Sequence, residues 1–533
     1  MAVNTKENIK NLIGQIPFAA ELYWLVRQQG STIQSRFSLE KLDKNIPDLI
    51  EAVTQLQKDN DNGENVFIFS TLHYWIEHAA VLGAALSGLG NHVTLAYLPY
   101  SDWQSSINKF DLDRQNAYAK KVLSKLNPIL KPVSFLVRNK KGIKLPQELQ
   151  QAIKEVTRYD AQYTLQVEDV DPESDIYKMR LKRNRIVAHA AYTWLRAKHP
   201  DVVIVPNGTI QEFGIVYRVA RFLGIPVVTY EFGDQRDRIW LAQNSEIMQQ
   251  KTEDMWEARK DMPISKVEME KVQEMFQSRQ RATLWENFSR LWQDTPTEGG
   301  LKVKETLGLD DRPIVLLPTN VLGDSLTLGR ELFCNSMAEW VSRTVQYFSG
   351  RNDVQFVIRV HPGEVLTHGL AMEDVVRDVL PELPENIYLI GPTDKVNTYD
   401  LVEIADLGIV YTTTVGMEMA MAGLPVVVAG KTHYRDRGFT HDPDSWVDYY
   451  KTIGKIIEDP KSFRLDENKT KLAWNYAYRF FFEFPRPYPW HLVNMWEDYQ
   501  NKSLLDVFSK DEIDQYRPTF DYLLGKKLNW ENI

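Results

Sequence analysis

The chain has 533 residues, which is more than one hydrophobic core usually holds and predicts two domains. Its 63 Lys and Arg residues against 72 Asp and Glu residues give a net charge of −9, which excludes the basic field of a general nucleic-acid-binding protein. The one cysteine, Cys334, excludes an intramolecular disulfide and a CxxC metal site, and it favours a reducing, cytoplasmic setting.

Residues 1–60 are predicted to be helical, and they begin without the basic-then-apolar plan of a signal peptide. The apolar run "IPFAAELYWLV" is too short to span a bilayer and contains Glu21. Two interpretations remain open for it. It could lie on the inner face of a membrane as a peripheral contact, or it could be a helix docked on the body of the protein, which we favour.

A first α/β block is predicted over residues 61–245. "VFIFS" and "VTLAYL" are apolar strand runs around an alanine- and leucine-rich helix, and "DVVIVP" and "VVTYE" repeat the pattern further on. The stretch between the two patterns, residues 101–200, is charged and mostly helical. Residues 246–305 are polar, carry no strand signal and predict a helical linker or insertion.

A second α/β block is predicted over residues 306–470. Its strands are "PIVLLPTN", "VQFVIRV", "NIYLIG", "LGIVYTTT" and "PVVVAG", with helices between them, one of which has Asn397 and Asp400 placed as a cap and its partner. The aromatic-rich segment 471–533 predicts helices that pack back on the body, although its rings could also form a carbohydrate platform.

These alternating patterns predict an α/β fold of two Rossmann-like, doubly wound domains facing a cleft, with N-terminal helices and a C-terminal helical tail. In open parallel sheets, ligands bind beyond the carboxyl ends of the strands. The polar residues that follow strands are therefore the candidates for a site.

The loop "YTTTVGMEMAMAG" ends one strand and opens a short helix. Thr413 and Thr414 offer hydroxyl groups beside free backbone N–H groups, a combination that suits phosphate. Gly416 would allow a ligand to approach closely, and Glu418 could accept hydrogen bonds from a ribose diol. Threonine-rich strand ends also occur without ligands, as simple helix caps.

Two further loops leave the same predicted sheet. "RVHPGE" places Arg359 and His361 where they could contact a phosphate or a base, and "GKTHYRDRGFT" follows a later strand with Tyr434 and Arg435. Asn320 closes the strand "PIVLLPTN". A single histidine at a strand end is usually structural, but three such loops on one sheet favour a ligand site.

The run from "HPGE" to "GKTHYRDRGFT" resembles the C-terminal domain of GT-B glycosyltransferases, and most closely the capsule-polysaccharide enzymes of the Kdo-transferase type. Those enzymes carry an "HP" loop, an "S/T-x-x-G-x-E" loop and a "G-x-x-x-Y-x-x-x-G-x-T" segment, which here match His361–Pro362, Thr413–Glu418 and Gly430–Thr440. "VPNGTIQEFG … YEFG" is similar to an N-terminal segment of the family, with Asn207, Gly208, Glu231 and Gly233 in the matching positions.

The resemblance implies a cytoplasmic enzyme that binds a nucleotide-sugar in its C-terminal domain and a glycan or glycolipid acceptor in its N-terminal domain. It points to CMP-Kdo or a related sugar as the donor, and to no cofactor and no metal. The DxD pattern of metal-dependent transferases ends no convincing core strand here; it occurs at Asp59–Asp61, Asp111–Asp113, Asp169–Asp171 and Asp442–Asp444.

Glycosyl transfer requires that a base take the proton of the acceptor hydroxyl while the leaving phosphate is neutralised. Glu231 ends a strand of the first block, Asp234 follows it, and His73 follows the first strand. We expect Glu231 to be catalytic and His73 to lie on the acceptor side. Glu231 could instead only cap a loop, and the run "DQRDR" that contains Asp234 could be a solvated ion-pair cluster.

Two other functions compete with that of a metal-independent glycosyltransferase of surface-polysaccharide or glycolipid synthesis. One is a nucleotide-sugar 2-epimerase on the same fold, although residues 246–300 and the long tail argue against it. The other is a non-catalytic nucleotide- or glycan-binding partner in a polysaccharide assembly complex. The expected partners are a nucleotide-sugar and a glycan or glycolipid, with no nucleic acid.

Overall fold

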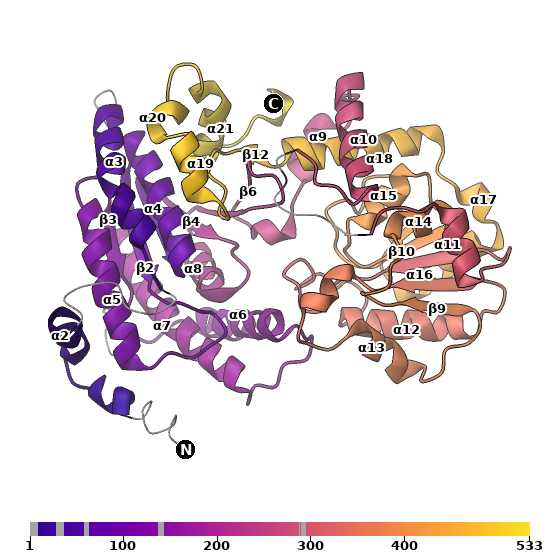
Figure 1. Ribbon diagram of the computed structural model, residues 1–533, viewed down its shortest axis with the longest axis horizontal. Helices are drawn as coiled ribbons and strands as arrows, with labels where there is room; N and C mark the ends of the chain where they lie inside the picture. Colours follow the sequence, from indigo (N-terminus) through magenta and orange to yellow (C-terminus); the bar gives the residue numbers. More distant parts are fainter. Residues whose placement is uncertain are drawn as a thin grey trace. The chain divides into compact units, whose positions relative to one another are not determined.

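The computed structural model describes residues 9–27, 37–57, 63–136, 143–286, 288 and 295–532. Within them the chain forms two units, each built around one β-sheet (Figure 1). Unit 1 comprises Met1–Thr164, Asp171–Met248 and Arg486–Leu528. Unit 2 comprises Leu165–Val170, Gln249–Pro485 and Asn529–Ile533. Each unit is therefore assembled from several stretches of the sequence.

The sheet of unit 1 has the strand order β12-β6-β5-β4-β1-β2-β3. Strands β5, β4, β1, β2 and β3 are parallel to one another. At one edge of the sheet β6 pairs antiparallel with β5, and β12 pairs antiparallel with β6. The strands are β1 (Asn65–Thr71), β2 (His92–Leu98), β3 (Lys131–Ser134), β4 (Val202–Pro206), β5 (Val227–Glu231), β6 (Arg238–Gln243) and β12 (Arg486–Pro487).

The central strands of unit 1 are mostly apolar and are buried over most of their length, because helices cover both faces of the sheet. Helix α4 packs against β1 and β2, and α8 packs against β1, β4 and β5. The two connections run in opposite directions from the β1–β4 pair, so right-handed crossovers place them on opposite faces. The α-helices described in unit 1 are α2 (Ala19–Val26), α3 (Glu40–Leu56), α4 (His73–Gly88), α5 (Lys109–Leu123), α6 (Gln147–Leu165), α7 (Asp175–Lys198), α8 (Gln211–Phe222), α19 (Met495–Asn501), α20 (Leu504–Val507) and α21 (Ile513–Leu523).

The sheet of unit 2 has the order β11-β10-β7-β8-β9, and all of its strands are parallel. From β7 the chain moves outward through β8 to β9, and it then returns to the other side of β7 to form β10 and β11. The strands are β7 (Ile314–Pro318), β8 (Gln355–Arg359), β9 (Ile387–Ile390), β10 (Leu407–Val410) and β11 (Val426–Val428).

Several helices of unit 2 begin at a serine or asparagine cap, as their sequences predict. The side chain of Asn397 accepts a hydrogen bond from the backbone of Tyr399. The prediction that Asp400 is the partner of Asn397 in this cap is wrong. The side chain of Asp400 instead accepts hydrogen bonds from the backbone N–H groups of Glu298 and Gly299. The helices are α9 (Glu253–Arg259), α10 (Lys266–Gln280), α11 (Gly300–Leu307), α12 (Met337–Ser349), α13 (Met372–Val379), α14 (Thr398–Ile404), α15 (Val415–Met421), α16 (Trp446–Glu458), α17 (Pro460–Phe463) and α18 (Glu467–Tyr478).

The aromatic C-terminal segment is divided between the two units. Helix α18 and the π-helical turn that follows it, Arg479–Glu483, belong to unit 2. Arg486–Leu528 belongs to unit 1, where Tyr488 and Trp490 are fully buried. These rings fill cores and do not form a surface platform.

Two doubly wound, Rossmann-like sheets are present, and this part of the predicted fold is confirmed. The sequence did not reveal β3, which lies in the stretch read as helical, nor the antiparallel strands β6 and β12. Parts of the predicted N-terminal helical segment, and the loop from Lys58 to Asn62, lie outside the described residues.

Candidate functional site

A pocket in unit 2 opens at the carboxyl ends of three strands. It lies where the chain reverses its direction across the sheet, between β7 and β10, which is where ligands bind in open α/β sheets. The loops after β7, β8 and β10 and the first turn of α14 all contribute to its wall. The lining residues are Pro318, Thr319, Arg359, His361, Pro362, Thr398, Tyr399, Thr413, Thr414, Val415 and Glu418.

His361 lines this pocket and also closes the loop behind it. Its ring Nδ1 accepts a hydrogen bond from the backbone N–H of Gly363 at 3.0 Å. Its own backbone N–H donates to Oγ1 of Thr319 at 3.1 Å. Because Nδ1 is an acceptor, a neutral ring carries its proton on Nε2, which makes that nitrogen a hydrogen-bond donor. The structural role and the pocket position therefore coexist in one side chain.

Arg359 ends β8 and is almost completely buried. Its guanidinium donates to the backbone carbonyl of Gly391 and, at 3.4 Å, to that of Asp394. These bonds tie the end of β8 to the loop after β9. A positive charge is thereby fixed in the wall of the pocket.

Thr413 and Thr414 form the strand-to-helix turn on the other side of the pocket. Tyr434 is fully buried and donates from its hydroxyl to the carbonyl of Thr413 at 2.6 Å. A Cβ atom on Gly416 would stand 2.4 Å from that same hydroxyl. The close approach at Gly416 is therefore made by Tyr434, where a ligand was predicted, and Tyr434 shapes the turn from behind, outside the pocket lining.

Glu418 reaches the pocket from the first turn of α15, with both carboxylate oxygens engaged. Oε1 accepts from Nη1 of Arg279 at 2.9 Å, and Oε2 accepts from the hydroxyl of Tyr399 at 2.6 Å. The Arg279 guanidinium lies over the rings of Phe276 and Phe481, 5.0 and 4.9 Å from their centroids. Burial and the neighbouring Glu418 raise the pKa of Tyr399 well above its ordinary value.

Arg279 belongs to α10, in the segment predicted as a linker, and sequence reasoning missed it. The helix repeats Val272, Met275, Phe276 and Arg279 on its buried face. An arginine within an apolar stripe at helical spacing is the signal that could have revealed a buried ion pair.

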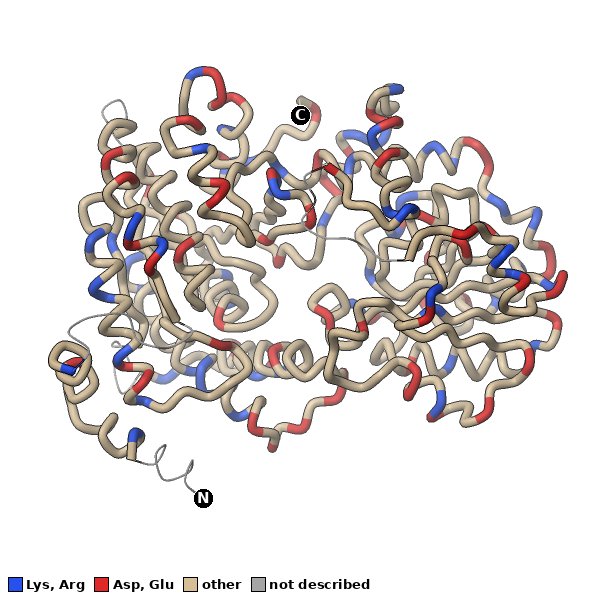
Figure 2. Tube along the Cα trace, viewed as in Figure 1, with Lys and Arg blue, Asp and Glu red and all other residues tan. Residues whose placement is uncertain are grey.

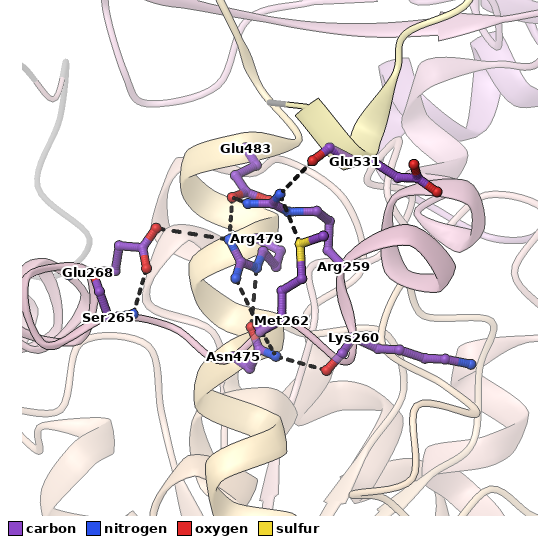
Figure 3. A network of polar contacts seen from close by, with 9 residues as sticks. All are labelled: Arg259, Lys260, Met262, Ser265, Glu268, Asn475, Arg479, Glu483 and Glu531. Carbon is purple, nitrogen blue, oxygen red and sulfur yellow. Dashed lines mark hydrogen bonds and ion pairs between the residues drawn. The ribbon is translucent and has the colours of Figure 1, made fainter.

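A polar network fixes the chain where it enters α10 (Figure 3). Glu483 accepts from Arg259 at 2.7 and 3.1 Å and also pairs with Arg479, two arginines that come from different helices. Arg479 and Asn475 donate to the carbonyl of Met262, at 2.9 and 3.2 Å. Helix α10 then opens with a capping box between Ser265 and Glu268. The position of Arg279 rests on this anchored start.

Besides Gly416 and Tyr434, two further predicted candidates of unit 2, Asn320 and Arg435, do not line the pocket. The side chain of Asn320 accepts from the backbone of Thr412 at 3.2 Å and so joins the loops after β7 and β10. Arg435 donates to the carbonyls of Val428 and Asp442 and pairs with Asp444 at 2.8 Å. Both side chains organise loops of the sheet edge.

In unit 1 the corresponding reversal lies between β1 and β4. Asn207 follows β4, has a positive φ of 55° and donates from its amide to Oε2 of Glu231 at 3.1 Å. Glu231, at the end of β5, also accepts from the backbone of Phe232 at 3.1 Å. Burial raises the pKa of Glu231 to about 7. A carboxyl group of this kind exchanges its proton near neutral pH. Asp234 lies in the same loop and is partly buried.

His73 is the first residue of α4, directly after Leu72, whose φ is 65°. Its ring lies edge-on to Phe37 and Tyr74, and burial lowers its pKa. Within the described part of the chain, its Nδ1 is buried without a hydrogen-bond partner. The backbone strain at Leu72 and the unsatisfied ring nitrogen of His73 therefore lie together at the sheet reversal.

A pocket in unit 1, which we call the serine pocket, follows β2. It is lined by Ser101, Asp102, Ser105, Ser106, Ile107 and Arg183. The Arg183 guanidinium lies 4.1 Å from the Tyr100 ring centroid and donates to the carbonyls of Asp102 and Ser105. Burial, with smaller contributions from the nearby Tyr163, Glu231 and Asp102, raises the pKa of Tyr74 to about 12. Glu231 and Asp102 are therefore both electrostatic neighbours of Tyr74.

Sequence reasoning also missed Arg183. It shares one face of α7 with Arg180, Asn184, Val187 and Ala188, all of them buried. Arg180 pairs with Asp160 and Glu212, at 3.1 and 3.3 Å. As in α10, polar residues at helical spacing within an apolar stripe are the sequence signal for buried polar contacts.

The described ranges contain no cluster of three or more His, Cys, Asp or Glu side chains that could hold a metal ion. The Asp59–Asp61 pattern lies outside them. Asp442, in another of the DxD patterns, accepts a hydrogen bond from Thr440 at 2.9 Å within its own loop. Among the helices with described coordinates, none is both long and apolar enough to cross a bilayer.

The sequence matches no family profile and no curated protein. Among solved structures, it is similar to the β-Kdo 2,7 transferase of Thermosulfurimonas dismutans KpsC, with 15% identity, 58% of this chain and 88% of that chain covered, and a TM-score of 0.33. It is also similar to the β-Kdo 2,4 transferase of the same protein, with 15% identity, 52% of this chain and 79% of that chain covered, and a TM-score of 0.32. UDP-GlcNAc 2-epimerase of Neisseria meningitidis, bound to UDP-GlcNAc, shares 13% identity, with 79% of this chain and 99% of that chain covered and a TM-score of 0.25. Kdo transferases are the class that the motifs resemble, but TM-scores of 0.33 and below carry no argument about activity.

Proposed function

We propose that the chain is a glycosyltransferase that moves a sugar from a nucleotide-sugar to a glycan or glycolipid acceptor. The observation that carries the proposal is the unit 2 pocket, where the loops after β7, β8 and β10 bring Arg359, His361, Thr413, Thr414 and Glu418 to one place. Five residues chosen as phosphate or ribose contacts thus share one wall at the ligand position of the fold.

The pocket offers complementary groups to a nucleoside diphosphate or monophosphate. His361 presents Nε2, Arg359 supplies fixed positive charge, and the hydroxyls of Thr413 and Thr414 are further donors to phosphate oxygens. Glu418 keeps its carboxylate in the wall and can accept from ribose hydroxyls, because each oxygen has a second lone pair. These groups neutralise a leaving phosphate without a metal ion.

In unit 1, Glu231 is the proposed base. The acceptor hydroxyl oxygen bonds to the anomeric carbon while the bond from that carbon to the phosphate oxygen breaks. The hydroxyl proton passes to Glu231, whose pKa of about 7 suits that transfer near neutral pH. The negative charge of the leaving phosphate is taken up by the donors around Arg359 and His361. His73, Asn207 and the serine pocket would hold the acceptor.

A labelled nucleotide-sugar, supplied with and without a glycolipid or oligosaccharide acceptor, tests the proposal. Transfer of the label to the acceptor, together with loss of transfer in Glu231→Gln, is the expected result. Conversion of the sugar to its 2-epimer in the absence of acceptor would identify an epimerase instead. Binding of nucleotide with neither reaction, over CMP-, UDP-, GDP- and dTDP-sugars, would identify a non-catalytic partner. CMP-Kdo is the first donor to include, because of the motifs described above.

A further inference from the structure

The N-terminal segment of unit 1 exposes an unusual amount of apolar surface. Six large side chains between residues 12 and 26 are each at least 58% exposed, and together they define the α2 surface: Leu12, Ile16, Phe18, Leu22, Leu25 and Val26. Contiguous apolar patches of this kind mark interaction sites on soluble proteins. The linings of the unit 2 pocket and of the serine pocket do not include any of these residues.

The exposure does not come from a failure of the segment to dock. Ala20 and Trp24 are buried on the opposite side of α2, which packs against α5. The ring centroids of Tyr23 and Phe110 are 5.5 Å apart. A Cβ atom on Gly14 would lie 2.7 Å from the backbone nitrogen of Phe110. The helix thus has one face on the protein and a second apolar face turned outward.

The charges around this surface are opposite to those of the chain as a whole. Residues 9–27 and 109–123 together carry six Lys and Arg against three Asp and Glu, a net charge of +3, whereas the whole chain carries −9. Basic positions of α5 are blue in Figure 2. Two of them, Lys120 and Lys121, are exposed, as is Arg27 at the end of α2. An apolar surface that ends at Arg27, on a segment that carries net positive charge together with α5, complements an anionic lipid surface.

We propose that the α2 surface docks on a membrane that contains anionic phospholipid. Its apolar side chains enter the boundary between headgroups and acyl chains, and the flanking basic residues meet the lipid phosphates. A second copy of the chain is the poorer occupant, because two surfaces of net positive charge repel each other. The inference is independent of the nucleotide site, and it assigns the protein a lipid surface as a partner.

Flotation with lipid vesicles tests the inference on the full chain. Vesicles of phosphatidylcholine with about one quarter phosphatidylglycerol should bind the protein, and binding should fall with added salt as the charges are screened. Leu12→Ser/Leu22→Ser/Val26→Ser should weaken binding by at least about tenfold. The matched control, Val267→Ser/Leu301→Ser/Val447→Ser, replaces three apolar residues that are 74–75% exposed in unit 2 and should bind like the parent.

Equal binding by the two triple variants, or no binding by the parent, would overturn the inference. Sedimentation equilibrium adds a second criterion. If the parent forms dimers that the α2 variant cannot form, the surface is an interface between copies and the membrane assignment is wrong. Nucleotide binding by the α2 variant should equal that of the parent, so failure here leaves the proposed transferase function standing on its own test.

Discussion

Arg279 and Glu418 form a buried ion pair in unit 2, with 2.9 Å between Nη1 and Oε1. The arginine comes from α10 and the glutamate from α15, 139 positions apart in the sequence. Breaking such a pair from one side leaves an uncompensated charge in the protein interior. The pair therefore links α10, which lies in the segment predicted as a helical linker or insertion, to the wall of the unit 2 pocket.

Replacement of Arg279 by Gln should weaken nucleotide binding by about tenfold, because Glu418 loses the partner that orients it. Arg279→Lys should recover part of the affinity. Calorimetric titration of the parent and of both variants with nucleotide measures these affinities.

Lys266→Gln is the matched control for this prediction. Lys266 stands at the start of the same helix, with 90% of its side chain exposed. A parent-like affinity in Arg279→Gln, or an equal loss in Lys266→Gln, would show that the ion pair does not position Glu418 for a ligand.

His361 should be separable into its two roles. In His361→Asn the amide oxygen can still accept from the backbone of Gly363, so the loop and the melting temperature should be retained. The donor at Nε2 is lost, and the nucleotide Kd should rise by about tenfold, the value of one charge-assisted hydrogen bond. Nucleotide binding unchanged in this variant would mean that "HPGE" only leads the chain out of the sheet.

Glu231 should make both activity and stability depend on pH. Its pKa in the folded chain is about 7, against an ordinary value of 4.5. Between these values the folded chain holds a proton that the unfolded chain has released, so stability falls as the pH rises from about 4.5 to 7. The loss amounts to about 3 kcal/mol above pH 7. The turnover rate should rise over the same range and level off above it.

Melting temperatures of the parent and of Glu231→Gln, compared from pH 4 to 8, check the stability part. The amide of Glu231→Gln does not titrate. The melting temperature of the parent should therefore fall relative to that of Glu231→Gln as the pH rises. A constant difference would contradict a raised pKa at this position.

Gly416→Ala should lower the melting temperature, because the new methyl group would meet the Tyr434 hydroxyl and Val410 at 2.4 and 2.8 Å. Overpacking of this kind costs about 1–3 kcal/mol. Gly350→Ala is the control, since no atom lies within 4 Å of its Cβ position. If the two variants melted together, the space beside Gly416 would be open to a ligand after all.

The sequence predicted the sheets well where strands are apolar and bounded by Gly or Pro, as in β7, β8 and β10. It missed β6, whose "RIWLAQ" alternates and pairs antiparallel, because a parallel pattern was expected there. The sequence predicted that His361, Thr413 and Glu418 lie close together, because the carboxyl ends of parallel strands meet at one edge of the sheet, and all three line the unit 2 pocket. The partner of Glu418 could not be predicted, since Arg279 lies on a helix whose packing depends on tertiary contacts.

The roles of Tyr434 and Gly416 could not be predicted from the sequence. The resemblance marked both positions, but in the structure the two residues pack against each other behind the turn. A glycine that makes room for a neighbouring side chain and a glycine that makes room for a ligand look the same in one sequence. Only the coordinates of the tyrosine hydroxyl separate the two.

The most direct test is a calorimetric titration of the full chain with CMP, UDP, GDP and dTDP, run on the parent and on His361→Asn. The account predicts saturable binding of at least one nucleotide to the parent and about tenfold weaker binding of that nucleotide to the variant. Absence of binding for all four, or equal affinity of parent and variant, would contradict a nucleotide site at the β7–β8–β10 edge of unit 2.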